Sequence, residues 1–250
     1  MTKSSGKAYF LSDLHLGASY REDSREIEKS VVKFLDSIKD EVWELYLLGD
    51  ILDYWYEYKY VVPRGYVRFL GKLAELSDSG VKITWIIGNH DIWIFDYIPS
   101  ETGVTVIDGI LDCNVLGVPF SLQHGDAIGG SAKFRFIRSL FRNKTCQKLY
   151  SNIHPRWTVG FAYSWSRHSR MKKRVIGEWP LNLIASIRDW CENRIKMGDP
   201  AKYYIFGHLH RLYDEPLNSD RHLIVLPDWP STEMYGVFDG NEFKIEKFNK

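Results

Sequence analysis

One pattern constrains the fold of this 250-residue chain more than any other: short apolar runs that end in clusters of His, Asp and Asn. Five runs end in this way, in the order DLH (13–15), GDILD (49–53), GNHD (88–91), HGD (124–126) and GHLH (207–210). Short apolar runs bounded by glycine are typical of buried strands. Because ligands gather outside the carboxyl ends of strands in open α/β sheets, the five clusters can converge on one site. The pattern predicts an α/β fold with its chemistry at one sheet edge.

Helix-periodic stretches separate the first three runs and predict a parallel sheet covered by helices. Residues 27–38 place one apolar stripe on the core side. A second helix is expected from about Pro63, with four apolar side chains facing inward: Val67, Leu70, Leu73 and Leu76. Beyond residue 103 short apolar segments follow with few helices between them, so we expect a second, more antiparallel sheet packed on the first. One later helix is expected over 181–197, with one apolar face formed by Leu183, Ile184, Ile187, Trp190 and Cys191.

The domain organisation is expected to be simple. No linker or repeat divides the chain, so 1–250 is predicted to form one domain with a helical insert at 131–200. The first residues contain no apolar core of signal-peptide length, and no run approaches the ~18 apolar residues of a membrane span. Three widely spaced cysteines favour reduced thiols over a disulfide framework. These features favour a cytoplasmic protein.

The insert carries an unbalanced charge. Twelve of the 33 basic residues lie between Ser131 and Val175, a stretch without Asp or Glu, which leaves 21 basic and 32 acidic residues elsewhere. Such a block indicates an anionic partner, which could be phosphate, nucleic acid or a membrane surface. Basic and apolar side chains alternate at helical spacing over 134–142, which favours a membrane surface. The alternative is a helical cap whose arginines are merely solvated. Confinement of the charge to one insert argues against nucleic acid, and no obligate protein partner is indicated.

Each polar cluster by itself is a weak signal, because Asp after a strand often only forms a turn. The five clusters in this order are far more specific, and they resemble those of the calcineurin-like metallophosphoesterases over about residues 8–240. The resemblance implies a four-layer αββα sandwich with a two-metal centre at one edge. One metal would be held by Asp13, His15, Asp50 and His210, and the other by Asp50, Asn89, His124 and His208, with Asp50 bridging.

The same resemblance assigns roles around the metals. Asp50 and Asn89 would act in catalysis together with His90, which would face the phosphate as a proton donor or charge stabiliser. Asp53 and Asp91 would orient ligands without binding a metal. Carboxylate, amide and imidazole ligands without thiolate suit Mn²⁺, Fe or Zn²⁺, and we expect two divalent ions, with Mn²⁺ the first choice. Such a pair can lower the pKa of a bound water and neutralise phosphate charge.

Within that superfamily, the insert with its SRHSRMKK stretch and the motifs GDILDYW and GNHDIW resemble the UDP-2,3-diacylglucosamine diphosphatases of lipid A synthesis. That resemblance implies a peripheral enzyme on the inner face of the inner membrane. It would hydrolyse a lipid-linked nucleotide to UMP and 2,3-diacylglucosamine 1-phosphate. Asn89 and His90 would contact substrate, as would Ser166, Arg170 and Lys173 of the insert. Many proteobacterial members carry arginine at the position of His90.

Two other interpretations remain open at this stage. The chain could be a metallophosphoesterase that acts on another nucleotide or phosphodiester. It could also be a non-catalytic, membrane-surface binding module on the same fold. The aromatic run DYWYEYKY (53–60) is likewise ambiguous, since it could be a packed loop or a wall of the substrate pocket.

Overall fold

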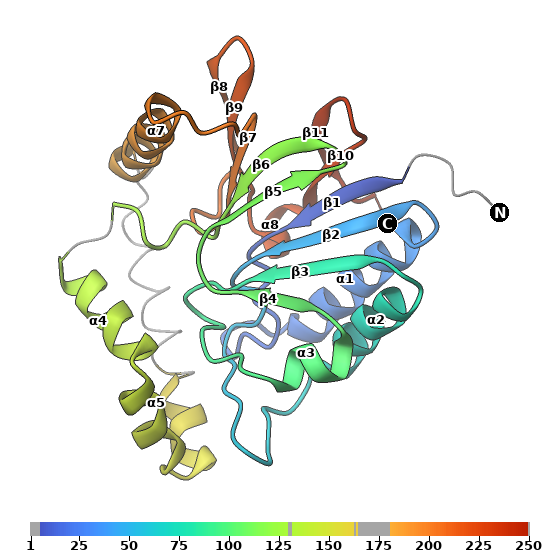
Figure 1. Ribbon diagram of the computed structural model, residues 1–250. Helices are drawn as coiled ribbons and strands as arrows, with labels where there is room; N and C mark the ends of the chain where they lie inside the picture. The colour runs from blue at the N-terminus through green and yellow to red at the C-terminus, as the bar shows by residue number, and fades with distance from the viewer. Residues whose placement is uncertain (1–5, 130–131, 163, 165–180, 250) are drawn as a thin grey trace.

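Two β-sheets form the centre of the computed structural model, which describes residues 6–129, 132–162, 164 and 181–249 (Figure 1). The first sheet has the strand order β11-β10-β1-β2-β3-β4. Its strands are β1 (Lys7–Leu11), β2 (Val42–Leu48), β3 (Lys82–Ile86), β4 (Thr105–Ile107), β10 (Met234–Phe238) and β11 (Phe243–Lys247). Strands β1 to β4 run parallel, and β10 and β11 extend the sheet antiparallel beyond β1.

The second sheet has the order β5-β6-β7-β9-β8. Its strands are β5 (Leu111–Val115), β6 (Val118–Leu122), β7 (Tyr203–Phe206), β8 (Tyr213–Asn218) and β9 (Arg221–Val225). The second sheet was expected to be more antiparallel than the first, and it is mixed: its outer pairs β5-β6 and β8-β9 are antiparallel, while β6, β7 and β9 run parallel at its centre. The chain between β6 and β7 is long enough for the crossover that parallel pairing requires. Three of the late apolar segments, now β4, β10 and β11, belong to the first sheet instead.

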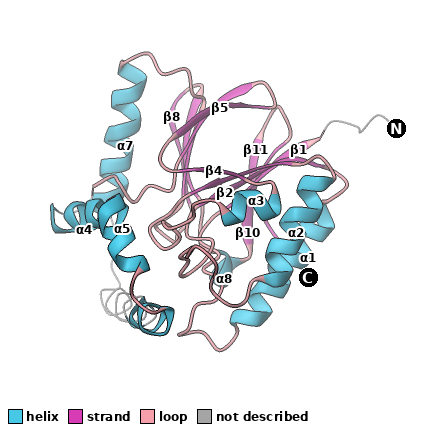
Figure 2. Cartoon of the chain, turned by 60° about the horizontal axis from the view of Figure 1, so that its bottom comes forward, coloured by secondary structure: helices cyan, strands magenta, loops and turns pink. Residues whose placement is uncertain are grey.

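Helices cover the outer faces of both sheets (Figure 2). The helices α1 (Ser24–Ile38), α2 (Val67–Asp78) and α3 (Tyr97–Thr102) lie on the side of the first sheet. Helix α7 (Leu181–Lys196) lies on the second sheet, and α8 (Trp229–Thr232) precedes β10. Helices α4 (Ala132–Arg142) and α5 (Lys144–Ser151), followed by helical residues 155–162, lie beside the sandwich in the described part of the insert.

Three apolar cores separate the four layers. One lies between the first sheet and its helices, with Phe34 of α1 and Leu73 of α2 fully buried in it. A second lies between the sheets, where Phe10 and Phe120 stack. The third joins α7 to the second sheet through residues such as Ile187. This arrangement confirms the expected four-layer sandwich. Helix α7 falls within the range 131–200 expected for the insert, yet it packs as the outer layer of the second sheet.

Helix α2 differs from its expected orientation. Val67 is 75% exposed, and Leu70 is only partly buried. The buried stripe is Phe69, Leu73 and Leu76, and the helix begins at Val67, directly after Tyr66, which has a left-handed backbone. Among the residues that the structure describes, no helix combines the length and apolar character needed to span a membrane.

Candidate metal centre at the carboxyl edge of the sheets

The seven side chains expected to bind metal come from the carboxyl ends of five strands. Asp13 and His15 follow β1, Asp50 follows β2, and Asn89 follows β3. The remaining three come from the second sheet: His124 follows β6, while His208 and His210 follow β7. The two sheets therefore meet at this edge and bring residues nearly 200 positions apart into one site.

The backbone at these positions is unusual. Among the residues that the structure describes, eight non-glycine residues have a positive φ, and five of them are expected ligands: Asp13, His15, Asp50, His208 and His210. Non-glycine residues adopt this left-handed conformation at a cost, and they do so most often at functional sites. The chain therefore turns sharply after β1, β2 and β7, just where their polar side chains enter the shared site.

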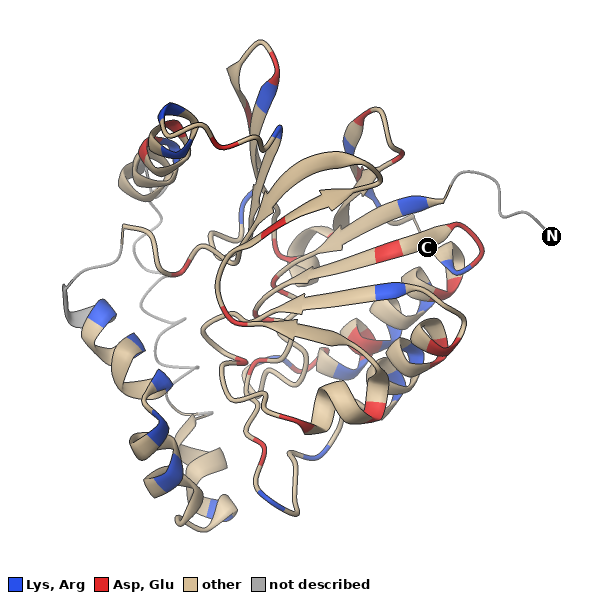
Figure 3. Cartoon of the chain, in the orientation of Figure 1, with Lys and Arg blue, Asp and Glu red and all other residues tan. Residues whose placement is uncertain are grey.

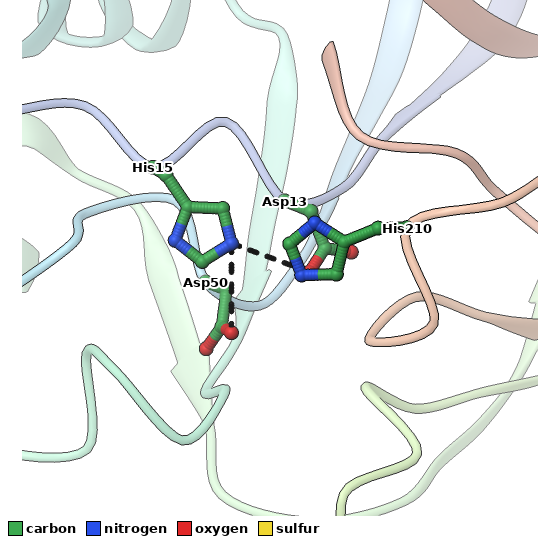
Figure 4. A group of neighbouring side chains, drawn as sticks. All are labelled: Asp13, His15, Asp50 and His210. Atoms are coloured by element: carbon green, nitrogen blue, oxygen red, sulfur yellow. Dashed lines mark ion pairs between the residues drawn. The ribbon is translucent and has the colours of Figure 1, made fainter. Parts of the chain in front are cut away.

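The first group of ligand atoms lies around Asp13. Asp13 Oδ1 is 3.6 Å from His15 Nε2 and 3.3 Å from His210 Nε2. His15 Nε2 is also 3.8 Å from Asp50 Oδ2. The candidate atoms of these four residues all lie within 4.8 Å of one another (Figure 4). Ligands that bind one cation at ~2.0–2.2 Å have separations of this order.

The second group lies around His124. Its Nε2 atom is 3.4 Å from Asp50 Oδ2, 3.3 Å from Asn89 Oδ1 and 3.3 Å from His208 Nδ1. Asp50 Oδ2 therefore faces His15 of the first group and His124 of the second. Asp50 Oδ1 points away and accepts hydrogen bonds from the backbone N–H groups of Asn89 and His90. Asp50 Oδ2 is thus the one oxygen that faces both groups of candidate ligands.

Hydrogen bonds orient the ligands on the side away from the centre. His124 Nδ1 donates to the carbonyl oxygen of Leu48, which leaves Nε2 as the nitrogen with the lone pair. Asp13 Oδ2 accepts from Ser12 Oγ and from the backbone N–H of His208. Asp13 Oδ1 is buried and accepts no hydrogen bond. A buried carboxylate oxygen that faces two imidazoles fits a cation ligand, because it otherwise loses its solvation.

The electrostatics of the cluster also suit cations. Burial alone would raise the pKa of Asp50, but the neighbouring imidazoles, His124 foremost, hold it well below its ordinary value. Burial likewise opposes ionisation of Asp13, and the charge of His210 outweighs it and lowers the pKa. Burial lowers the pKa of His124, yet Asp50 and Asp13 raise it to about 10. The buried carboxylates thus attract positive charge, which a divalent cation would supply in place of protons.

His90 and Asp53 lie on one side of the first group. Asp53 Oδ1 is 3.3 Å from His15 Nδ1, the ring nitrogen opposite to the one that faces Asp13. Carboxylates in this position fix the orientation of a metal-binding imidazole. His90 Nδ1 hydrogen-bonds the carbonyl oxygen of Asp53, and its Nε2 lies 4.0 Å from Asp50 Oδ2. His90 is 19% exposed, so its ring borders the centre and remains accessible from solvent.

Asp91 connects the loops after β2 and β3. Its carboxylate accepts hydrogen bonds from the backbone N–H groups of Ile51 and Gly88 and from Trp85 Nε1. Burial is the main reason that the pKa of Asp91 is raised. Because Ile51 and Gly88 flank Asp50 and Asn89, Asp91 positions both ligands without facing the centre. Ser12 and Trp85 have comparable supporting contacts, and the sequence marks only Ser12, by its place beside DLH.

The aromatic run after the second cluster is a packed loop. Tyr54, Trp55 and Tyr56 are all at most 3% exposed. Glu57 is also buried, and its carboxylate accepts hydrogen bonds from four backbone N–H groups at the start of α3. The outer side of the loop contacts the insert, since Tyr56 Oη donates to the carbonyl oxygen of Gln147 in α5. The run therefore forms a platform on which the insert rests.

Two arginines of the basic insert contact loops of the sandwich. Arg138 pairs with Asp126 at 2.7 Å, and Arg142 contacts Asp108 and the carbonyl oxygen of Gly88. The basic residues of α4 and α5 are without acidic neighbours on their own helices (Figure 3). The sequence does not predict the contacts of Arg138 and Arg142, because their acidic partners lie in distant loops of the sandwich. The expected substrate contacts Ser166, Arg170 and Lys173 lie outside the described residues.

Comparison with known proteins places this geometry in a family. A UDP-2,3-diacylglucosamine hydrolase of Porphyromonas gingivalis is 40% identical, over 96% of this chain and 97% of the relative. Relatives of the same name from Nitrosococcus oceani and Neisseria meningitidis are 26% and 27% identical, each covering at least 86% of both chains. The sequence model of the calcineurin-like phosphoesterases matches residues 6–212. This match covers all five polar clusters, and the chain belongs to the calcineurin-like phosphoesterase family.

Proposed function

We propose that this protein hydrolyses the pyrophosphate of UDP-2,3-diacylglucosamine, releasing UMP and 2,3-diacylglucosamine 1-phosphate. The observation that carries the proposal is the convergence of seven oxygen and nitrogen ligands in a chain that aligns end to end with hydrolases of that name. Two divalent ions, Mn²⁺ foremost, would be held by the groups around Asp13 and His124. When bound, such a pair activates a water and neutralises phosphate charge.

The roles of the side chains follow from their positions. Asp50 would hold both cations with one oxygen, while its second oxygen is fixed by the backbone of Asn89 and His90. Water would attack the α-phosphorus, and the bond from that phosphorus to the bridging oxygen would break. His90 would hold the phosphate oxygens, because its ring lies beside Asp50 and its Nδ1 is anchored by Asp53. The leaving sugar phosphate needs no strong acid to depart.

The test is release of UMP from UDP-2,3-diacylglucosamine in detergent with Mn²⁺. We expect turnover by the wild-type protein and a loss of at least ~10³-fold in Asp50→Asn, which removes the shared ligand. A soluble aryl phosphodiester serves as the control substrate. Cleavage of that diester without any UMP release would leave the phosphoesterase in place and reject the lipid substrate, in favour of another nucleotide or phosphodiester. If the protein cleaved neither substrate, the result would favour the non-catalytic binding module.

We also propose that the described part of the insert docks on the inner face of the inner membrane. Six of its large apolar side chains are exposed: Phe136, Leu140, Leu149, Ile153, Trp157 and Phe161. Exposed basic side chains of the same segment accompany them: Arg135, Lys144, Lys148 and Arg156. Exposed apolar and basic groups together suit an anionic lipid surface, with no need for a transmembrane helix.

Sedimentation with vesicles tests the membrane proposal. We expect binding to vesicles that contain anionic lipid, weaker binding at high salt because exposed charges are screened, and little binding to neutral vesicles. Trp157→Glu should reduce binding, whereas Tyr60→Ser, at an exposed aromatic outside the insert, should not. Equal binding by the wild-type and Trp157→Glu proteins would contradict the proposal. Nucleic acid is not proposed as a partner, nor is an obligate protein partner.

A further inference from the structure

A cavity of about 640 Å³ opens beside the metal centre, between the loop after β6 and helix α7. Small-molecule sites have volumes of ~300–1,000 Å³ and combine apolar walls with a few polar groups. Ile87 and Ile110 form an apolar wall, and Gln123, Asp189 and Asn193 contribute polar groups. No role assigned above uses these residues.

Gln123 is the most informative residue of the cavity. It follows β6 directly, and its backbone N–H is held by the carbonyl oxygen of Ile205. The residue is only 5% exposed, yet its Nε2 atom has no hydrogen-bond partner within the part of the chain that the structure describes. Leaving a buried amide donor without a hydrogen bond destabilises the folded protein by about 1–3 kcal/mol. A ligand that accepts a hydrogen bond from this amide would remove that cost. The amide also offers an acceptor oxygen next to the donor.

The charges of the cavity disfavour a phosphate as its occupant. Asp126 and Asp189 both line it, and Arg138, the one arginine among the described lining residues, is already paired with Asp126 at 2.7 Å. Asp189 lies exposed on α7 and remains available to accept from hydroxyl groups. A neutral ligand with an imide or amide edge and hydroxyl groups fits this lining better than an anion does.

The cavity is continuous with the metal centre through His124, which lines it and belongs to the second ligand group. A phosphate held at that group would direct its ester substituent into the cavity. Resting on the substrate proposed above, we propose that the cavity binds the nucleoside end of the substrate. The Gln123 amide would pair with the imide edge of the pyrimidine, and Asp189 would accept from a ribose hydroxyl.

Calorimetric titration of the manganese-loaded protein with UMP and with inorganic phosphate tests this proposal. Phosphate reports on the metal centre alone, and the extra affinity of UMP reports on the nucleoside. We expect UMP to bind at least about tenfold more tightly than phosphate in the wild-type protein. Gln123→Met, which keeps the length of the side chain but removes the amide, should lower UMP affinity about tenfold and leave phosphate affinity unchanged.

Two further variants make the test decisive. Ser121→Ala alters a buried residue two positions earlier on β6 that does not line the cavity, and it should bind UMP like the wild type. Asp189→Ala changes an exposed residue and should weaken UMP binding about threefold without affecting the fold. Equal affinity for UMP and phosphate in the wild type would overturn the proposal. The proposal would also be overturned if Gln123→Met and Asp189→Ala both bound UMP as tightly as the wild type. An equal loss of UMP and phosphate affinity in Gln123→Met would overturn it as well.

UMP binding and substrate cleavage can be measured separately, so the nucleoside site and the lipid substrate can be rejected independently. UMP binding that depends on Gln123 in a protein that does not cleave UDP-2,3-diacylglucosamine would keep the nucleoside site and reject the lipid substrate. Cleavage of that substrate with UMP binding that does not depend on Gln123 would reject the nucleoside site alone.

Discussion

Asp13, His15, Asp50, His208 and His210 share a left-handed backbone that ordinary residues avoid. A non-glycine residue in such a conformation costs about 1–3 kcal/mol and persists only where its surroundings fix it. Here the fixing contacts are hydrogen bonds between neighbouring loops, such as those from the N–H groups of Asp13 and His15 to the carbonyl oxygens of Gly49 and Asp50. The site is therefore preformed by the backbone, and small neighbouring residues make room for the ligands.

Gly207 tests that dependence on small residues. A Cβ atom there would lie 1.9 Å from Ser12 Oγ and 2.7 Å from Asp13 Oδ2. We predict that Gly207→Ala displaces Asp13 and weakens manganese binding about 10- to 100-fold, as loss of a supporting contact typically does. Titration of the metal-free protein with Mn²⁺ measures the change. If Gly207→Ala bound Mn²⁺ as tightly as the wild type, the position of Asp13 would not depend on the small residue at 207.

Gly71 provides the matched control, because a Cβ atom there meets nothing within 4 Å. It lies in the interior of α2, where glycine costs about 0.5–1 kcal/mol relative to alanine. Gly71→Ala should therefore raise the free energy of unfolding by about that amount and leave metal affinity unchanged. Urea unfolding followed by circular dichroism checks the first expectation. A loss of stability would mean that α2 is not helical at this position.

The cysteines give a prediction about pH. Burial raises the pKa of the Cys191 thiol to about 12 and that of Cys113 to about 11. A raised thiol pKa means that the folded state holds its proton, so this contribution to stability is present below pH 9 and is lost as the pH rises further. At pH 8 iodoacetamide should label the partly exposed Cys146 and spare the buried Cys191 until the protein unfolds. Equal labelling of Cys146 and Cys191 in the folded protein, read by mass spectrometry, would contradict the burial of Cys191.

Helix α5 is connected to the metal centre by the aromatic platform. Tyr54 contacts Tyr150, Tyr56 contacts Gln147, and Trp93 Nε1 donates to the carbonyl oxygen of Phe141. Tyr54 directly follows Asp53, and Trp93 lies two residues after Asp91. The same loops thus carry ligand-orienting carboxylates on one side and support the insert on the other.

The Tyr56 contact can be tested by itself. Tyr56→Phe removes a 2.7 Å hydrogen bond to Gln147, worth about 1 kcal/mol. We predict about fivefold faster hydrogen exchange in α5, with exchange in the sandwich strands unchanged. Tyr60→Phe is the control, since Tyr60 is 84% exposed. Unchanged exchange in α5 would mean that other contacts determine how the insert is held.

The sequence predicts strands and ligand clusters better than it predicts helix faces and partners. An apolar run such as that of β2 predicts a buried strand from its own composition. The polar clusters can be located in the same way, because each directly follows such a run in the chain. The inward face of α2 depends on how the helix packs against its neighbours, which the spacing of apolar residues alone does not fix: Val67 is exposed, whereas Phe69 is buried. The ion pair between Arg138 and Asp126 depends on how the insert folds back, which a one-sided run of charge does not reveal.

The molecule as a whole brings two sheets together so that both contribute to one centre. The first sheet supplies the expected ligands Asp13, His15, Asp50 and Asn89, while the second supplies His124, His208 and His210. The four layers and their order along the chain could be predicted once the five clusters were seen as a set. The cavity at Gln123 could not, because α7, the loop after β6 and the turn near Ile110 are distant in sequence.

Titration of metal-free protein with Mn²⁺ tests the central claim most directly, with bound manganese and UMP release from UDP-2,3-diacylglucosamine followed in the same samples. We predict two tightly bound ions per chain, with UMP release that rises as the second ion binds and is lost in Asp50→Asn. Full activity without metal would contradict the two-metal centre. Two bound ions without UMP release would contradict the proposed substrate.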